Sequence, residues 1–122
     1  MDITLQLREN LAWAAGIVDG EGSFTSSYER PHFILGQASE YDESGWFAKP
    51  FMIVRFSALL DKLGIAHKIY HHKPKAQGGR STWNLNVHKF EAYQALAVFL
   101  WKWLGPVKKL QYKRTIQVFL NK

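Results

Sequence analysis

Cysteine is absent from the 122 residues, and this absence narrows the chemistry open to the chain. Without thiols there is no disulfide framework, no thiolate zinc site and no cysteine nucleophile, and the composition fits a reducing compartment. The longest apolar stretch, residues 95–101, is far shorter than the ~18 residues that span a membrane. The N-terminal residues have no basic segment followed by an apolar core, as a secretion signal would. We therefore expect a protein of the cytoplasm or an organellar matrix, without a membrane partner.

Acidic residues are scarce as well. The chain has 10 Asp and Glu against 16 Lys and Arg, which gives a formal net charge of +6. Such a charge indicates a polyanionic partner such as nucleic acid, although it is also compatible with ordinary solubility. Hydrophobic residues make up 47% of the chain, so it is globular rather than disordered. Its length predicts a single domain over residues 1–122.

Hydrophobic periodicity predicts an α+β fold with the order α-β-β-α-β-β-α-α. Helical spacing covers residues 5–19, 51–63, 89–104 and 107–120, and alternation covers 23–30, 32–39, 65–73 and 81–87. Residues 40–49 read as a polar loop, and residues 74–79 as a basic turn. Gly20 and Gly22 are expected to end the first helix, because glycine readily takes the left-handed conformation that stops one. Helices then cover one face of an antiparallel sheet and leave the other face polar and basic.

Residues 14–22, Ala-Ala-Gly-Ile-Val-Asp-Gly-Glu-Gly, form the most unusual stretch. An apolar, small-residue helix ends there in two acids interleaved with glycines, and a metal ion is the natural partner for crowded carboxylates. Small residues also share one face of this helix, at i, i+3, i+4 and i+7. This face allows close packing against a helix of another subunit or of the same one, and its members are Ala12, Ala15, Gly16 and Asp19. Because Asp19 lies on this face, we expect it to cap a neighbouring helix end rather than to bind metal.

These residues resemble the LAGLIDADG motif, in the variant that ends Asp-Gly-Glu-Gly. Its flanks are similar too, with Trp13 before it and Ser23-Phe24 opening the first strand. The resemblance extends over nearly the whole chain, because the predicted element order is that of one LAGLIDADG homing endonuclease domain of the single-motif type. Two positions depart from the family pattern: Ala14 stands where leucine is usual, and Glu21 where aspartate is usual.

The resemblance implies a homodimer that makes a double-strand break with short 3′ overhangs in a pseudo-palindromic DNA target. The small-residue face named above would be the dimer interface. Glu21 and the backbone carbonyl of Gly20 would bind Mg²⁺ at the dimer axis. Gln37 would order water near the metal, and Lys108 would activate water or stabilise phosphate charge. Lys109 is the alternative in this register.

The polar face of the predicted sheet would lie against double-stranded DNA, since the major groove admits a β-ribbon. Some of its side chains suit base edges, and the lysines of the basic turn suit phosphates. The predicted DNA-binding residues are Thr25, Ser27, Arg30, His32, Lys68, Tyr70, His72, Lys73, Lys75, Gln77, Arg80, Thr82 and Asn84. The alternative is a non-cleaving nucleic-acid binder of the same fold, either a maturase that binds its intron RNA or a DNA-binding regulator. The histidines at 67, 71 and 72 are not expected to form a zinc site, because strand geometry separates them.

Overall fold

The computed structural model describes residues 3–28, 30–42, 45–74 and 79–121. The elements of this part of the chain follow the order α1 (Ile3–Glu21), β1 (Gly22–Ser27), β2 (Arg30–Ala38), β3 (Glu40–Asp42), β4 (Gly45–Ala48), α2 (Phe51–Leu63), β5 (Lys68–His72), β6 (Thr82–Val87), α3 (Phe90–Leu100) and α4 (Pro106–Leu120). None of the described helices combines the length and the apolar content that crossing a lipid bilayer requires.

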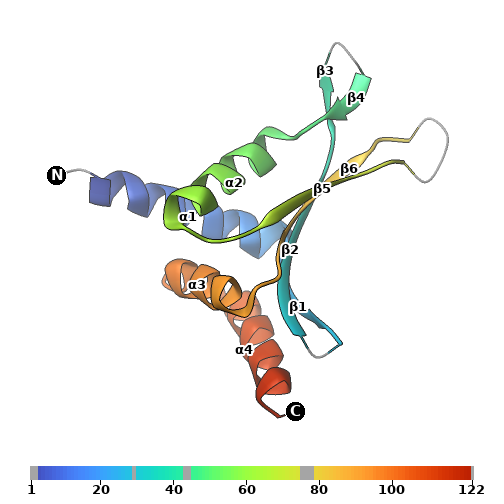
Figure 1. Cartoon of the computed structure of the whole chain (residues 1–122). Coiled ribbons are helices and arrows are strands. Elements are labelled where there is room, and N and C mark those ends of the chain that lie inside the picture. Colours follow the sequence, from blue (N-terminus) through green and yellow to red (C-terminus); the bar gives the residue numbers. More distant parts are fainter. Residues whose placement is uncertain (1–2, 29, 43–44, 75–78, 122) are drawn as a thin grey trace.

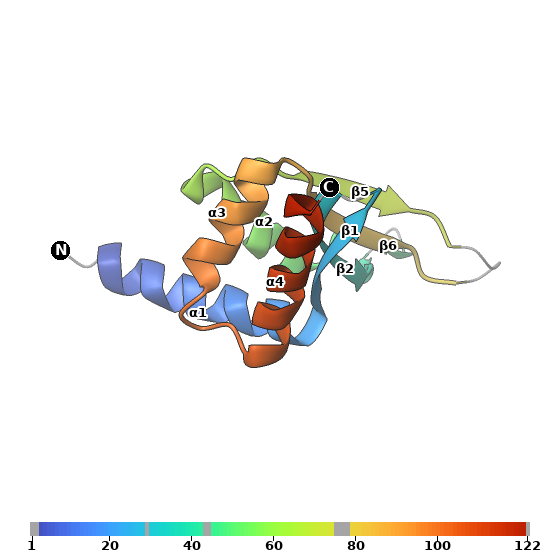
Figure 2. The ribbon, with the colours of Figure 1, turned by 90° about the horizontal axis from the view of Figure 1, so that it is seen from below.

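A four-stranded antiparallel sheet with the order β1-β2-β6-β5 is the centre of the fold. The helices lie on one side of this sheet (Figure 1). Seen from below, α4 lies alongside β1 and β2, which are the strands it packs against (Figure 2). The predicted α+β class and the antiparallel pairing are therefore confirmed, and one face of the sheet is not covered by any of the described helices.

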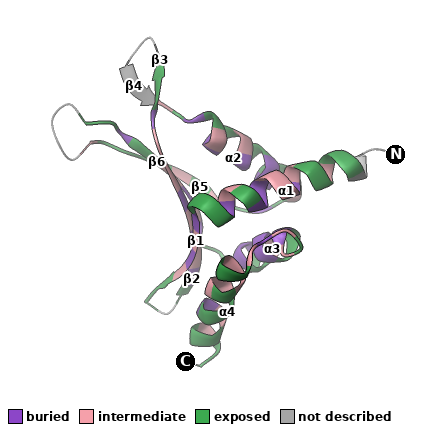
Figure 3. Ribbon diagram, turned by 180° about the vertical axis from the view of Figure 1, so that it is seen from behind, coloured by how far each residue is buried: buried purple, intermediate pink, exposed green. Residues whose placement is uncertain are grey.

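The core lies between the sheet and the helices (Figure 3). Alternate residues of the strands face the helices and are buried, among them Phe24, Phe33 and Leu85. Phe33 stacks on Phe56 of α2 with ring centroids 5.9 Å apart, and Phe24 meets the edge of Tyr93 of α3 at 5.6 Å. These contacts follow from the predicted alternation, because a period of two sends every second side chain to the same face.

Two element predictions are wrong. Residues 40–49 were expected to be a loop, but β3 and β4 pair there as a separate two-stranded sheet with an irregular register. The acids and the glycine of this stretch obscured a hairpin too short to show a clear alternation. The third helix was expected to reach residue 104 but ends at Leu100, and a turn over residues 101–103 leads to Gly105 and α4.

The end of α1 is also different from the prediction. Neither Gly20 nor Gly22 is left-handed, and among the described glycines only Gly64, at the end of α2, has a positive φ, of 73°. The helix continues through Gly20 to Glu21, and β1 begins directly at Gly22. A Cβ atom at Gly22 would lie 2.8 Å from Cε1 of Phe33 and 3.0 Å from the Cα of Val18. Close packing, rather than backbone conformation, is therefore what requires glycine at position 22.

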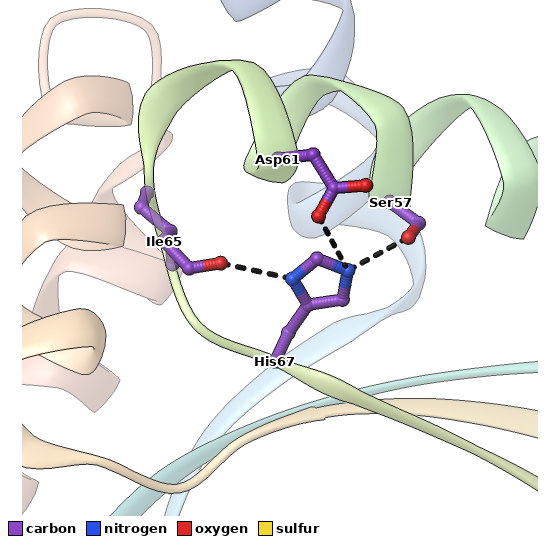
Figure 4. A network of polar contacts seen from close by, with 4 residues as sticks. All are labelled: Ser57, Asp61, Ile65 and His67. Carbon is purple, nitrogen blue, oxygen red and sulfur yellow. Dashed lines mark hydrogen bonds and ion pairs between the residues drawn. The ribbon is translucent and has the colours of Figure 1, made fainter.

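His67 has a structural place in the connection between α2 and β5 (Figure 4). Its Nδ1–H donates to the Ile65 carbonyl at 2.9 Å, and its Nε2 lies 2.7 Å from Oγ of Ser57 and 3.8 Å from Oδ1 of Asp61. His71 instead stacks on Trp83 at 4.0 Å. Among the described residues no group of three His, Asp or Glu side chains is arranged to hold a metal ion.

Candidate functional site

The joint between α1 and β1 brings Glu21 and Lys108 close together, although they lie far apart in the sequence. Glu21 is the last residue of α1 and is exposed. Lys108, in the first turn of α4, is half-buried, and its Nζ donates a hydrogen bond to the Gly22 carbonyl at 2.7 Å. The ammonium group is therefore fixed beside the residue that follows Glu21.

Two more contacts fix the start of α4 on this joint. Both carboxylate oxygens of Asp19 accept the backbone N–H of Gly105, the residue that caps α4, at 3.0 and 3.1 Å. The side-chain oxygen of Gln111 accepts the N–H of Phe24 in β1 at 3.4 Å. A carboxylate at a helix N-terminus is also favoured by the helix dipole. The prediction that Asp19 caps a helix end is confirmed, and that helix is the chain's own α4.

Gln37 borders the same end of the sheet through the strand register. Leu35 of β2 pairs with Gly22, so Gln37 lies two residues beyond the partner of Gly22 along β2. On its other side Gln37 pairs with Trp83 of β6. Nζ of Lys49 lies 5.4 Å from the centroid of the Trp83 ring, which adds a cation to this neighbourhood. Sequence reasoning missed Lys49, and the available signal was a cation directly before the proline that opens α2.

The donors at the joint suit a hard cation, but one chain provides only part of a coordination shell. The Glu21 carboxylate is exposed at the C-terminal end of α1, where the last backbone carbonyls, including that of Gly20, have no partner within the helix. Such oxygen ligands are the kind that Mg²⁺ prefers. Asp19 is already engaged with Gly105, so Glu21 is the one carboxylate of the motif that remains for a metal. These donors fit part of the coordination shell of a divalent cation.

The small-residue face of α1 requires a correction at one position. Ala15 is completely buried in the chain's own core, so it cannot contribute surface to a dimer contact. Gly16 and Gly20 are exposed, and a Cβ atom at either would meet nothing within 4 Å. With half-buried Ala12 they form a row at i, i+4 and i+8. The open face of α1 is therefore Ala12, Gly16 and Gly20, with Asp19 occupied beside it.

The uncovered face of the sheet collects the predicted polar side chains. The register aligns Gly36 with Asn84 and Asn84 with Tyr70, and it aligns Ala38, Thr82 and His72 in the next row. A Cβ atom at Gly36 would lie 2.7 Å from Oδ1 of Asn84, so glycine makes room for that amide. The members of the predicted DNA-binding set that share this face are Thr25, Ser27, Arg30, His32, Lys68, Tyr70, His72, Thr82 and Asn84.

The remaining members of that set lie beyond the strands. Lys73 follows β5 and Arg80 precedes β6, and both are exposed and line a hollow open to solvent together with Thr82. The guanidinium of Arg80 donates to the Ser39 carbonyl, which ties it to the end of β2. Lys75 and Gln77 lie outside the described residues. His88, which follows β6 on the same face, was missed, because the predicted strand stopped one residue before it.

The site thus combines an exposed glutamate, a fixed lysine and a polar sheet face. No protein-family model matches the sequence, and no curated protein matches it.

Proposed function

We propose that this chain is a site-specific DNA endonuclease of the LAGLIDADG type, which acts as a homodimer and depends on Mg²⁺. The observation that carries the proposal is the contact between Lys108 and the Gly22 carbonyl. It fixes a cation on the residue that follows the exposed Glu21, at one end of a sheet whose uncovered face is polar. A carboxylate and a lysine held together at the edge of a basic surface suit the hydrolysis of a phosphodiester.

The uncovered sheet face supports duplex DNA as the substrate. Its strands carry hydroxyl, amide, imidazole and ammonium groups, which are the donors and acceptors that read base edges and contact phosphates. A slightly twisted antiparallel ribbon fits the width of the major groove. The net charge of +6 adds attraction to a polyanion. The face therefore has the shape and the chemistry for a DNA contact of several base pairs.

The open row on α1 supports a two-fold dimer. Backbone atoms of two helices can approach closely at Ala12, Gly16 and Gly20, because these residues have at most a methyl side chain. Because α1 ends at Glu21, such a dimer would bring two Glu21 carboxylates toward the symmetry axis. Like charges at short range repel, and a divalent cation shared between them relieves this repulsion. The two copies would then cut the two strands of a pseudo-palindromic target and leave short 3′ overhangs.

Within each copy, the described residues have separate tasks. Glu21 and the Gly20 carbonyl would hold the metal, and Mg²⁺ when bound polarises the scissile phosphate. Lys108, oriented by the Gly22 carbonyl, would offset negative charge that develops on the phosphate oxygens. Gln37 has an amide that both donates and accepts hydrogen bonds, so it suits the ordering of a water molecule. The α4 contacts of Asp19 and Gln111 would keep Lys108 in position.

Cleavage of a randomised duplex library in Mg²⁺ tests this proposal, with Ca²⁺ as the condition for binding without cleavage. We expect Glu21→Gln to abolish cleavage and to leave DNA affinity largely unchanged. We expect Lys108→Met to lower the cleavage rate by about 10²–10³-fold, the usual cost of removing one group that stabilises transition-state charge. Glu9→Gln is the matched control, because Glu9 is also exposed on α1 but lies three turns before the joint.

The outcomes separate the alternatives. Wild-type rates in Glu21→Gln would refute the catalytic assignment. Tight DNA binding by the wild type without cleavage in any divalent metal would favour the non-cleaving binder.

A further inference from the structure

A group of aromatic and cationic side chains lies on the uncovered sheet face near the turn between β1 and β2, at the end of the sheet opposite Glu21. The ring of His88 stacks on His32 of β2, with centroids 6.0 Å apart and planes 27° apart. Tyr70 of β5 meets His88 edge-on at 6.4 Å. Rings from β2, from β5 and from the residue that follows β6 thus form one cluster, and its two imidazoles are stacked.

The surroundings of this cluster are strongly positive. The hollow on one side of His88 is lined by Lys68 and Lys89, and the hollow on the other side by Arg30 and Lys89. None of the residues that line these two hollows is acidic. The residues of α3 and α4 that line these hollows are the stacked pair Phe90 and Phe119, which carries no charge. The cationic groups therefore repel one another in the free protein.

This repulsion acts on the protonation of His88. Burial, together with the neighbouring His32 and Lys68, holds the pKa of His88 below its usual value. An unperturbed histidine titrates near pH 6.5, so His88 is uncharged at neutral pH. An anion bound between the rings and the lysines would raise the pKa of His88, because it stabilises the protonated imidazole.

We propose that His32 and His88, with Arg30, Lys68 and Lys89, form a binding site for a backbone phosphate of DNA, and that filling this site takes up protons. The inference rests on the proposed function, because it requires DNA on this face of the sheet. A His88 imidazole that is neutral in the free protein and protonated in the complex couples binding to pH in a fixed direction. Affinity for DNA increases as the pH falls from about 8 to about 6, and the increase saturates once His88 is also protonated in the free protein.

Two measurements test the site on the full chain. Fluorescence anisotropy with a labelled mixed-sequence duplex, in Ca²⁺ and at constant ionic strength, gives affinity at the two ends of this pH range. Calorimetry in two buffers of different ionisation enthalpy counts the protons taken up. We expect the wild type to bind about tenfold more tightly at the lower pH, the size of effect that one coupled histidine gives when its pKa rises by about 1.5 units on binding.

The double variant His32→Gln, His88→Gln should lose most of this pH dependence and most of the proton uptake. The difference in affinity between this variant and the wild type should be larger at the lower pH than at the higher pH, where proton uptake contributes little. His71→Gln is the matched control: it makes the same chemical change on the opposite sheet face and should keep the pH dependence. Circular dichroism confirms that each variant is folded.

The results distinguish this inference from the proposed function. DNA binding by the wild type that does not change with pH, or a double variant that keeps the wild-type pH dependence, would overturn the phosphate site and leave the endonuclease proposal standing. Absence of DNA binding at every pH would overturn both.

Discussion

At the scale of single residues, Gly22 determines how closely the helix and the sheet meet. It is buried, and its α-carbon hydrogens face the ring of Phe33 and the backbone of Val18. The same residue supplies the carbonyl that accepts the Lys108 hydrogen bond. A change at this position therefore affects both the packing of the joint and the position of the lysine.

We expect Gly22→Ala to lower the free energy of unfolding by about 1–3 kcal/mol, the usual cost of forcing an extra carbon into a packed core. The added Cβ would lie 2.8 Å from a ring carbon and 3.0 Å from a backbone carbon, and the backbone carbon cannot move aside cheaply. Urea unfolding measures the effect. The control is Ser23→Ala, one residue later on the other sheet face, which should change stability by less than about 0.5 kcal/mol. Equal stability of the two variants would contradict the packing role of Gly22.

Glu21 illustrates both the strength and the limit of reading residues from the sequence. The motif pattern singled out Glu21, Gln37 and Lys108, and in the structure Lys108 contacts the residue after Glu21 while Gln37 lies in β2, two residues beyond the partner of Gly22. The prediction for Gly20 and Gly22 was wrong, because it assumed that both glycines adopt the left-handed conformation that ends a helix. The contact of Gly22 with Phe33 joins distant residues, and no local pattern carries that information.

At the scale of elements, α4 determines where the lysine lies. Its N-terminal turn is held by Asp19 of α1 through Gly105, while Gln111 reaches the N–H of Phe24 in β1. Periodicity predicted this helix within one residue of its observed start. It could not predict where the helix docks, because docking depends on contacts between residues more than 80 positions apart.

Replacing Asp19 tests whether this cap positions Lys108, the proposed catalytic group. Asp19→Ala removes the acceptor, and we expect a loss of about 0.5–2 kcal/mol in unfolding free energy, typical for a lost cap. Asp19→Asn keeps an acceptor oxygen and loses only the charge at the helix end, a smaller change of about 0.3–1 kcal/mol. Cleavage rates measured well below the unfolding transition should fall more for alanine than for asparagine. An alanine variant that is folded and cleaves at the wild-type rate would show that Asp19 does not position Lys108.

At the scale of the whole molecule, two surfaces of the chain are not covered by its own described elements. The sheet face is uncovered by any described helix, and the row of Ala12, Gly16 and Gly20 on α1 is open. Composition predicted the basic character of the first surface. For the second surface the predicted residues differ from those that are open, because helical spacing alone cannot tell which small residues face the core. Ala15 faces it, whereas Gly16 does not.

Gly16 provides the sharpest test of assembly. A side chain at this position meets nothing within 4 Å in the chain itself, and replacing glycine inside a helix removes a penalty of about 1 kcal/mol. Gly16→Leu should therefore fold at least as well as the wild type as a single chain. In a dimer, the leucine would hold the two α1 helices apart and move both Glu21 carboxylates from the axis. We expect light scattering at micromolar concentration to show a dimer for the wild type and a monomer for Gly16→Leu, with cleavage lost in parallel. Gln94→Leu adds the same side chain at an exposed position of α3 and should stay dimeric and active. A wild type that is monomeric while it cleaves both strands would mean that the two carboxylates are not shared, and that Glu21 works within a single chain.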